Sequence, residues 1–357
     1  MHQLLHTRRA RLTAAAMSLT IAATGAVAVA TTATAATTTT NPSQAAAGWL
    51  ARQLTGPTHD HYSVSFNGQS FPDAGETIDG LLAMDAAHVA QTAATRVTKW
   101  LKANAKDYAT GSGFTPGTYY PGSLAKLLLA AEAQRASVHN FGGLDLVREL
   151  KKEEQPDGAY MNTGDKSFGS TPVAQSLALI ALSHTGSLSS WPDARAIAWL
   201  VGQQCGDGGF SSSTQSSPAK TCTDVDATAY AAQALLTVHS SAAAAALRWL
   251  GSHRNPDGGY GLDTKGKASS NANSTALAVQ ARLEAGYSVS APLRWLRNQQ
   301  IGCSGKSGRR GAVRLAAGYS YATALRATTQ AAQALAGRWL GDIDNAHAVD
   351  TEPRLAC

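Results

Sequence analysis

The chain reads WLVGQQCGDGGF from Trp199 to Phe210 and TDVDATAYAAQALL from Thr223 to Leu236. Glycine tolerates the positive φ angles at which helices end, so the Gly-rich segment predicts the end of a first helix. Thr223 and Asp224 can accept hydrogen bonds from the unpaired N–H groups at the start of a helix. The stretch therefore predicts a helix, a glycine turn and a second helix.

Units of this kind recur along the chain. The Asp-Gly turns begin at Asp157, Asp207 and Asp257, at intervals of 50 residues. The first helix of each unit shares an anchoring Trp or Leu, found at Trp49, Trp100, Leu150, Trp199, Trp249 and Trp295. A period this regular indicates a repeat architecture, here six helical hairpins of about fifty residues each.

The two helices of each unit differ in composition. The second helices are apolar or small almost all round, as in Ala227–Leu235, whereas first helices carry charges such as Lys151 and Lys152. A helix that is apolar all round is contacted on several sides. Such hairpins can form an open solenoid or a closed ring, and the difference between the two helices favours closure. We therefore expect an all-α fold in which the hairpins close into a ring over residues 44–340, with the second helices inside.

The N-terminal 35 residues have the features of a signal peptide. Basic residues at Arg8, Arg9 and Arg11 precede a weakly apolar stretch, and small residues place cleavage near Ala35. A membrane anchor fits less well, because Thr, Ser and Gly dilute the run and no other long apolar stretch follows. The Arg pair leaves twin-arginine export open as a route. We expect a secreted monomer with a Thr-rich, flexible leader at residues 36–43.

Four cysteines fit an oxidising compartment. Cys205 and Cys222 flank the insert between the glycine turn and the second helix, so we expect them to pair. Cys303 would then pair with Cys357 and tie down a C-terminal tail at residues 341–357. Zinc is the alternative, but the sequence has no Cys-x-x-Cys pair and no His at ligand spacing beside the cysteines. We expect no metal and no cofactor.

The basic charge of the chain comes largely from the signal peptide. The sequence has 30 Lys and Arg residues against 24 acids, and removing residues 1–35 leaves 27 against 24. Nucleic-acid binding requires clustered basic residues with aromatic residues between them. Only Lys306–Arg314 approaches this pattern, and its basic residues are explained by a solvated loop. No nucleic-acid partner is expected.

The repeats resemble those of the α6/α6 toroid superfamily, which includes terpene cyclases, protein prenyltransferase β subunits and cobalamin carriers. The segments Trp199–Phe210 and Trp249–Tyr260 are similar to the glutamine/tryptophan repeats of terpene cyclases. The resemblance covers the whole repeat region, residues 44–340, and implies an α6/α6 toroid. It says little about function, because the same fold hosts several unrelated activities.

The segment Asp224-Val225-Asp226-Ala227-Thr228 resembles the Asp-x-Asp-Asp motif of class II terpene cyclases. By that resemblance Asp226 would be the general acid that protonates an alkene, with Asp224 raising or orienting its proton. However, Ala227 replaces the third aspartate, and aromatic residues form only 6% of the chain. The alternative is that Thr223 and Asp224 cap the second helix.

The segment Ser274–Ala281 resembles the second helices of cobalamin carriers of the intrinsic factor type. That resemblance implies a small-molecule ligand, either corrinoid or hydrophobic. Asp79 lies inside an otherwise apolar second helix and is a candidate ligand-binding residue, together with Tyr230 and Gln280.

The function we expect is a secreted, non-catalytic toroid. It would bind a ligand or a surface partner through its central cavity, or through the mouth that bears the N-termini of the second helices. Two alternatives stay open. One is a terpenoid cyclase-like enzyme that uses Asp226 as general acid. The other is an envelope-associated structural module with a filled ring.

Overall fold

Capping side chains start most of the helices that the sequence assigned to the interior. The structure, a computed structural model, describes residues 37–111, 118–162, 170–185, 194–263 and 268–357. In each of the helices that begin after Asp73, Thr171, Asp224, Asn271 and Ser320, that residue's side chain accepts a backbone N–H of the first turn. The remaining interior helix begins with Pro121, whose fixed φ suits the first helical position.

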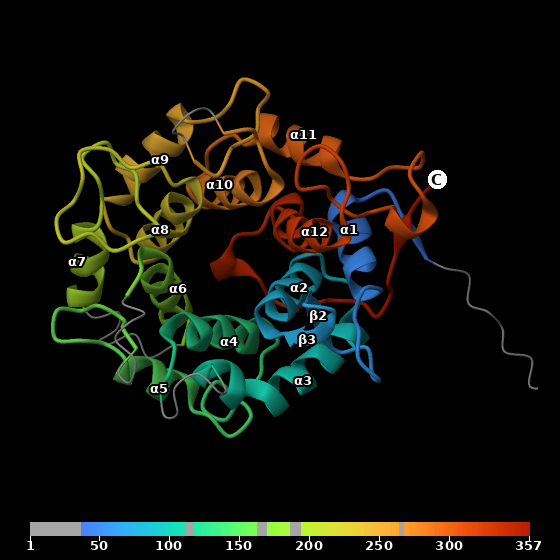
Figure 1. Ribbon diagram of the computed structural model, residues 1–357, viewed down its shortest axis with the longest axis horizontal. Coiled ribbons are helices and arrows are strands. Elements are labelled where there is room, and N and C mark those ends of the chain that lie inside the picture. Colours follow the sequence, from blue (N-terminus) through green and yellow to red (C-terminus); the bar gives the residue numbers. More distant parts are fainter. Residues whose placement is uncertain (1–36, 112–117, 163–169, 186–193, 264–267) are drawn as a thin grey trace, which may run out of the picture. The chain divides into compact units, whose positions relative to one another are not determined.

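Twelve α-helices in the described residues alternate between an outer and an inner position (Figure 1). The outer helices are α1 (Pro42–Ala51), α3 (Gln91–Thr110), α5 (Leu146–Lys152), α7 (Ala194–Gly202), α9 (Ala243–Ser252) and α11 (Ser290–Gln299). The inner helices are α2 (Ala74–Ala86), α4 (Pro121–Ala133), α6 (Pro172–Ser183), α8 (Val225–Thr237), α10 (Ala272–Glu284) and α12 (Tyr321–Leu335). Each inner helix packs on the next, and α12 packs on α2, so the expected closed ring is confirmed.

The remaining elements are short. Strands β2 (Tyr62–Phe66) and β3 (Gln69–Asp73) form an antiparallel hairpin before α2. Strand β1 (Thr38–Thr39) pairs in parallel with β4 (Arg354–Leu355). Two 3₁₀ turns, η1 (Ser307–Arg309) and η2 (Leu340–Asp342), follow α11 and α12. The predicted signal peptide, residues 1–35, lies outside the described residues.

The glycine turn of one unit is fastened to the outer helix of the next unit. Gly208 has φ +96°, and a Cβ there would lie 2.7 Å from the carbonyl oxygen of Ala245 in α9. The Asp207 carboxylate accepts a hydrogen bond from the indole Nε1 of Trp249 at 3.1 Å. Asp257 and Trp295 repeat this bond at 3.0 Å. Trp249 and Trp295 therefore hold neighbouring units together.

The same contact closes the ring. Gly311 has φ +94°, and a Cβ there would lie 2.5 Å from the carbonyl oxygen of Ala45 in α1. Trp49 donates its indole N–H to the carbonyl oxygen of Gly308 at 3.0 Å. The Gln300 amide donates to the carbonyl oxygen of Pro42 at 2.8 Å. The last unit thus holds the first unit in the way that the turns at Asp207 and Asp257 hold the units after them.

The C-terminal tail covers the end of the ring at which the inner helices finish. Leu340 N donates to the Gln233 side chain of α8 at 3.1 Å, and Asn345 N donates to the carbonyl oxygen of Ala133 in α4 at 2.9 Å. The ring of Trp339 lies 6.2 Å from that of His184, just after α6. Figure 1 shows this segment, in red, crossing within the ring of inner helices.

Both expected disulfides are present, Cys205–Cys222 and Cys303–Cys357. The pairing of β1 with β4 joins the two ends of residues 37–357, and the second disulfide ties Cys357 to the segment after α11. The sequence assigned residues 36–43 to a flexible leader. Instead they include β1 and the start of α1, because Arg354 N and Ala356 N donate to the carbonyl oxygens of Thr37 and Thr39, both at 2.8 Å.

We predict that Trp249→Phe destabilises the protein. The substitution removes the only N–H of the indole and leaves the Asp207 carboxylate without one of its partners, and bonds to charged groups contribute about 1.5–3 kcal/mol. Urea unfolding should show a loss of that size. Trp100→Phe is the control, since its ring stacks on His61 at 4.8 Å. Equal losses for the two variants would contradict the role given to the turn.

A second prediction concerns Asp85, which is 0% exposed and accepts a hydrogen bond from the Gln134 amide at 2.5 Å. Burial raises the pKa of Asp85 to about 7, so the native state holds its proton more tightly than the unfolded chain. The native state therefore loses stability as pH rises from about 4 to 7. Asp85→Asn should remove this loss.

The measurement compares unfolding free energies at pH 4 and pH 8. Relative to the wild type, Asp85→Asn should become more stable at the higher pH by on the order of 2 kcal/mol. Asp350→Asn, at an exposed position, is the matched control. A difference between Asp85→Asn and the wild type that does not change with pH would refute the prediction.

Candidate functional site

Polar side chains gather where the inner helices begin. The first turns of these helices form the mouth opposite the C-terminal tail. From here on, the mouth cluster means Glu76, Asp79, Lys126, Asp226, Tyr230 and Arg326, which come from α2, α4, α8 and α12. Two of the sequence candidates, Asp79 and Tyr230, belong to it together with Asp226. Most other side chains on these helices are small or apolar, so the cluster is a distinct polar feature.

An ion pair links α2 to α4 within the mouth cluster. The Lys126 Nζ lies 2.6 Å from Asp79 Oδ1 and donates to the carbonyl oxygen of Gly75 at 3.0 Å. Burial lowers the pKa of Lys126, but the Asp79 carboxylate outweighs that effect and the net pKa is raised. The two side chains remain 21% and 18% exposed, so solvent and solutes reach the pair.

Glu76 joins α2 to α12 across the ring closure. Its carboxylate accepts from Arg326 Nε and from the Thr329 hydroxyl, both at 3.2 Å. Burial raises the pKa of Glu76 to about 7, the neighbouring Asp79 adds to the rise, and Arg326 opposes it. Glu76 therefore titrates near neutral pH although a guanidinium lies beside it.

Asp226 occupies the first turn of α8 without capping it. The cap is Asp224, whose Oδ1 accepts from Ala227 N at 2.8 Å, as the capping interpretation of Asp224 predicted. Burial raises the pKa of Asp226 to about 6, a hydrogen bond with Ser274 opposes the rise and Asp224 adds to it. Its Oδ1 is buried and has no hydrogen-bond partner among the described residues.

Tyr230 lies one turn after Asp226 on α8. Burial raises the pKa of Tyr230, and the carboxylates of Asp79 and Asp226 raise it further. The pKa of the Tyr230 hydroxyl therefore depends on a carboxylate of α2 and on one of α8.

Gln280 lies deeper, away from the mouth cluster. It is 0% exposed, and its amide donates to the Gln333 side chain at 3.4 Å. Gln333 in turn donates to the carbonyl oxygen of Asp79 at 3.4 Å. Gln280 thus supports the inner helices behind the mouth, and its role as a ligand-binding residue stays a prediction.

Sequence reasoning missed Glu76, Lys126 and Arg326. Each is a charged residue within a second-helix segment that is otherwise rich in small or apolar residues, which is the signal that singled out Asp79. Applied to every second helix, that criterion would have found them. Their pairing could not be read from the sequence, since Glu76 and Arg326 are 250 positions apart.

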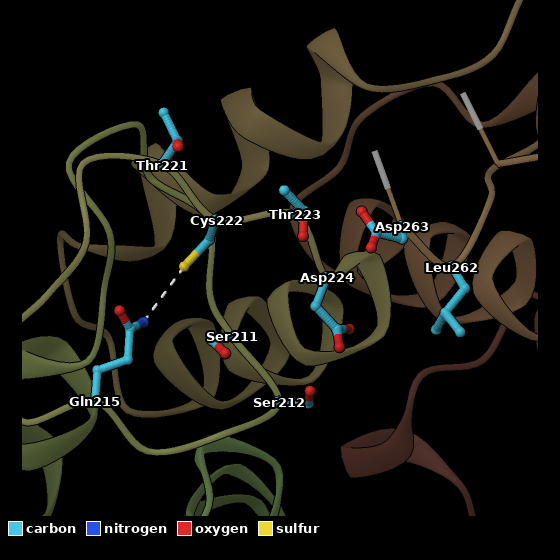
Figure 2. Close-up of a pocket in the computed structure, with 9 residues that line it drawn as sticks. All are labelled: Ser211, Ser212, Gln215, Thr221, Cys222, Thr223, Asp224, Leu262 and Asp263. Atoms are coloured by element: carbon cyan, nitrogen blue, oxygen red, sulfur yellow. Dashed lines mark hydrogen bonds between the residues drawn. The ribbon is translucent and has the colours of Figure 1, made fainter. Parts of the chain in front are cut away.

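A pocket of about 280 Å³ lies beside the first turn of α8 (Figure 2). One wall is the insert between Cys205 and Cys222, and the other includes Leu262 and Asp263 from the loop before α10. Gln215 of the insert donates its amide to the two disulfide sulfurs at 3.4 and 3.5 Å. We call this space the insert pocket.

Within the described ranges, no group of three or more His, Cys, Asp or Glu side chains is placed to hold a metal ion. In the same ranges, no helix has both the length and the apolar character needed to cross a membrane.

Solved structures with a similar fold come from different enzyme classes. The type II terpene cyclase MstE from Scytonema, without ligand, is 16% identical with a TM-score of 0.58, covering 83% of this chain and 96% of that one. The unsaturated glucuronyl hydrolase from Bacillus sp. GL1 is 12% identical with a TM-score of 0.59, covering 83% and 95%. At these identities the likeness shows the fold alone.

A third structure is matched only in part. The ent-copalyl diphosphate synthase from Streptomyces platensis is 19% identical with a TM-score of 0.51, and the match covers 76% of this chain but 53% of that one. A comparison with curated protein sequences gave no significant match. The family model for the prenyltransferase alpha-alpha toroid domain matches residues 77–321, which is more than half of the sequence. The chain therefore belongs to the prenyltransferase α/α toroid family.

Proposed function

We propose that the chain is a secreted, monomeric and non-catalytic toroid that binds a small molecule at the mouth formed by the N-terminal ends of the inner helices. The observation that carries this proposal is the mouth cluster, in which side chains of α2 pair with Lys126 of α4 and with Arg326 of α12. The C-terminal tail covers the opposite end through Leu340 and Asn345, which favours entry at the mouth.

The chemistry of the mouth favours a ligand with many polar groups. A hydrophobic ligand would have to remove water from Asp79 and Lys126 without replacing its hydrogen bonds, which is unfavourable. A corrinoid carries amide side chains around an apolar ring system, and those amides can bond to carboxylate, ammonium and phenol groups. Of the two ligand classes that the sequence raised, a corrinoid therefore fits the mouth better.

We predict that hydroxocobalamin binds the wild type and that the double variant Asp79→Asn, Lys126→Met binds it about tenfold more weakly, a loss of about 1.4 kcal/mol. Equilibrium dialysis with visible absorbance measures both affinities. The matched control is Glu149→Gln, Lys152→Met, which removes a Lys–Glu pair at 3.0 Å on outer helix α5.

If the two double variants bind hydroxocobalamin with equal affinity, the ligand does not bind at the mouth. If the wild type does not bind hydroxocobalamin, a corrinoid is excluded as the ligand. Native mass spectrometry of the protein purified from its own secretion addresses ligand binding itself. If no small molecule co-purifies and none binds, the envelope-associated structural module becomes the better explanation.

A second candidate function is proton-initiated terpenoid cyclisation, and one observation favours it. Asp226 combines a pKa raised to about 6 with a buried oxygen that has no partner among the described residues, and a general acid must hold a transferable proton. Its companion Asp224 is occupied as a helix cap. Asp226 alone would then supply the proton.

This candidate predicts cyclised products from a polyprenyl substrate such as geranylgeraniol, detected by gas chromatography with mass spectrometry. Asp226→Asn should lower the rate at least about 100-fold, which is typical for loss of a general acid. The rate should also fall as pH rises above about 6, since the proton of Asp226 is then lost. Asp145→Asn, at the N-cap of α5, should have no effect. A wild type without any cyclised product would exclude the enzyme.

A further inference from the structure

The hairpin formed by β2 and β3 carries apolar side chains on one of its faces. Val64 lies opposite Phe71 in the strand register, and Phe66 is two residues after Val64 on the same strand. Side chains that are directly opposite, or two apart on one strand, share a face. The three are 48%, 45% and 67% exposed in that order, and we call them the hairpin face. The other face of the hairpin carries Ser63, Ser65, Ser70 and Pro72.

The base of the hairpin is fixed to the ring. Tyr62 is 0% exposed, and its hydroxyl donates to the carbonyl oxygen of Leu50 at 3.0 Å. The backbone N–H of Tyr62 donates to the Thr77 hydroxyl in α2 at 2.9 Å. At the other end of the hairpin, the Asp73 carboxylate caps α2 by accepting from Glu76 N at 2.9 Å. The apolar face therefore begins in the core at Tyr62 and continues into solvent on a fixed support.

The chemistry of the hairpin favours a lipid surface as the occupant of this face. No residue from Tyr62 to Pro72 is charged, so the hairpin can leave water without stripping the hydration from an ion. Phe66 adjoins the turn at Asn67 and Gly68, where both φ angles are positive, and so lies at the tip. A two-stranded hairpin has unpaired backbone groups at its edges, which restricts it to the headgroup depth of a bilayer, where water can bond to them.

The outer helix beside the hairpin supplies a matching charge. The ring of Trp100 in α3 stacks on that of His61 at 4.8 Å, and Pro72 of β3 and Trp100 line one pocket of about 410 Å³. Lys99 and Lys106 are exposed and two turns apart, so they share one face of α3. Basic side chains near an apolar hairpin complement anionic headgroups. Of the outer helices, α3 has the largest excess of basic residues, with Arg96, Lys99, Lys102 and Lys106 against Asp107.

We propose that the hairpin face and the exposed lysines of α3 bind the protein to an anionic lipid surface. Val64, Phe66 and Phe71 would enter the boundary between headgroups and acyl chains, and Lys99 and Lys106 would contact lipid phosphates. In such binding, the buried apolar area and the attraction to anionic lipids reinforce each other. This surface shares no residue with the mouth cluster, and the proposal does not depend on the function proposed above.

The test is flotation of the purified protein with vesicles of phosphatidylcholine and phosphatidylglycerol in equal parts, and with vesicles of phosphatidylcholine alone. We expect the wild type to bind the anionic vesicles at least about tenfold more tightly than the neutral ones. Phe66→Ser, Phe71→Ser should weaken binding to the anionic vesicles at least about tenfold, because apolar area is lost. Leu262→Ser, Val349→Ser is the matched control, at positions 52% and 49% exposed outside the hairpin, and should bind like the wild type.

A second pair of variants tests the charge and leaves the hairpin intact. Lys99→Gln, Lys106→Gln should weaken binding to the anionic vesicles about tenfold and leave binding to phosphatidylcholine unchanged. The matched control is Arg294→Gln, Arg297→Gln, which removes two exposed basic residues from outer helix α11 and should have little effect. Thermal unfolding of each variant shows whether it is folded.

Three flotation results would overturn the proposal. They are a wild type that does not float with the anionic vesicles, a hairpin variant that binds as tightly as its control, and equal losses for the lysine and arginine variants. Analytical ultracentrifugation tests the competing occupant, a second copy of the chain. A wild type that forms dimers without binding vesicles, and loses them on Phe66→Ser, Phe71→Ser, would assign the hairpin face to that second copy and refute the lipid contact.

Discussion

The ring depends on the contact between the glycine turn of one unit and the outer helix of the next. The turn must bring its backbone against that helix, which only a residue without a Cβ permits at Gly208. The Asp207 carboxylate then fixes the distance by accepting from Trp249. Inner helices that are rich in alanine and other small residues can pack closely only if their units are spaced this regularly. The polar groups at the mouth meet as a result of that spacing.

The sequence predicted the hairpins and the closed ring because the contacts that define them repeat every fifty residues or so. A contact that repeats in every period places the same residue types at equal intervals, as at Asp157, Asp207 and Asp257. Strand β1 has no repeating sequence pattern of this kind. A strand of two residues shows no alternation, and its partner Arg354–Leu355 lies at the other end of the chain. The sequence therefore predicts a flexible leader at residues 36–43, where the structure has β1 and the start of α1.

The candidate site was predicted less completely than the fold. The Asp224 cap was predictable because capping is local and needs only the residues that follow. The environment of Asp226 was not, because its burial depends on helices from other units. Lys126 and Glu76 were visible as charges in apolar segments, but their partners are set by ring closure. Local chemistry could be read from the sequence, whereas the meeting of distant side chains required the structure.

Closure by a repeated contact also sets the order in which the chain can finish folding. Each earlier unit can pack on its successor while the chain is still incomplete, through contacts between units close in sequence. The bond from Trp49 to Gly308 joins residues 259 apart, and the strand pairing and disulfide after it involve the final residues. Contacts between distant residues form slowly. The apolar faces of α1 and α12 that meet at this seam therefore stay uncovered until the last segment arrives, which makes the seam the part of the fold most open to aggregation during folding.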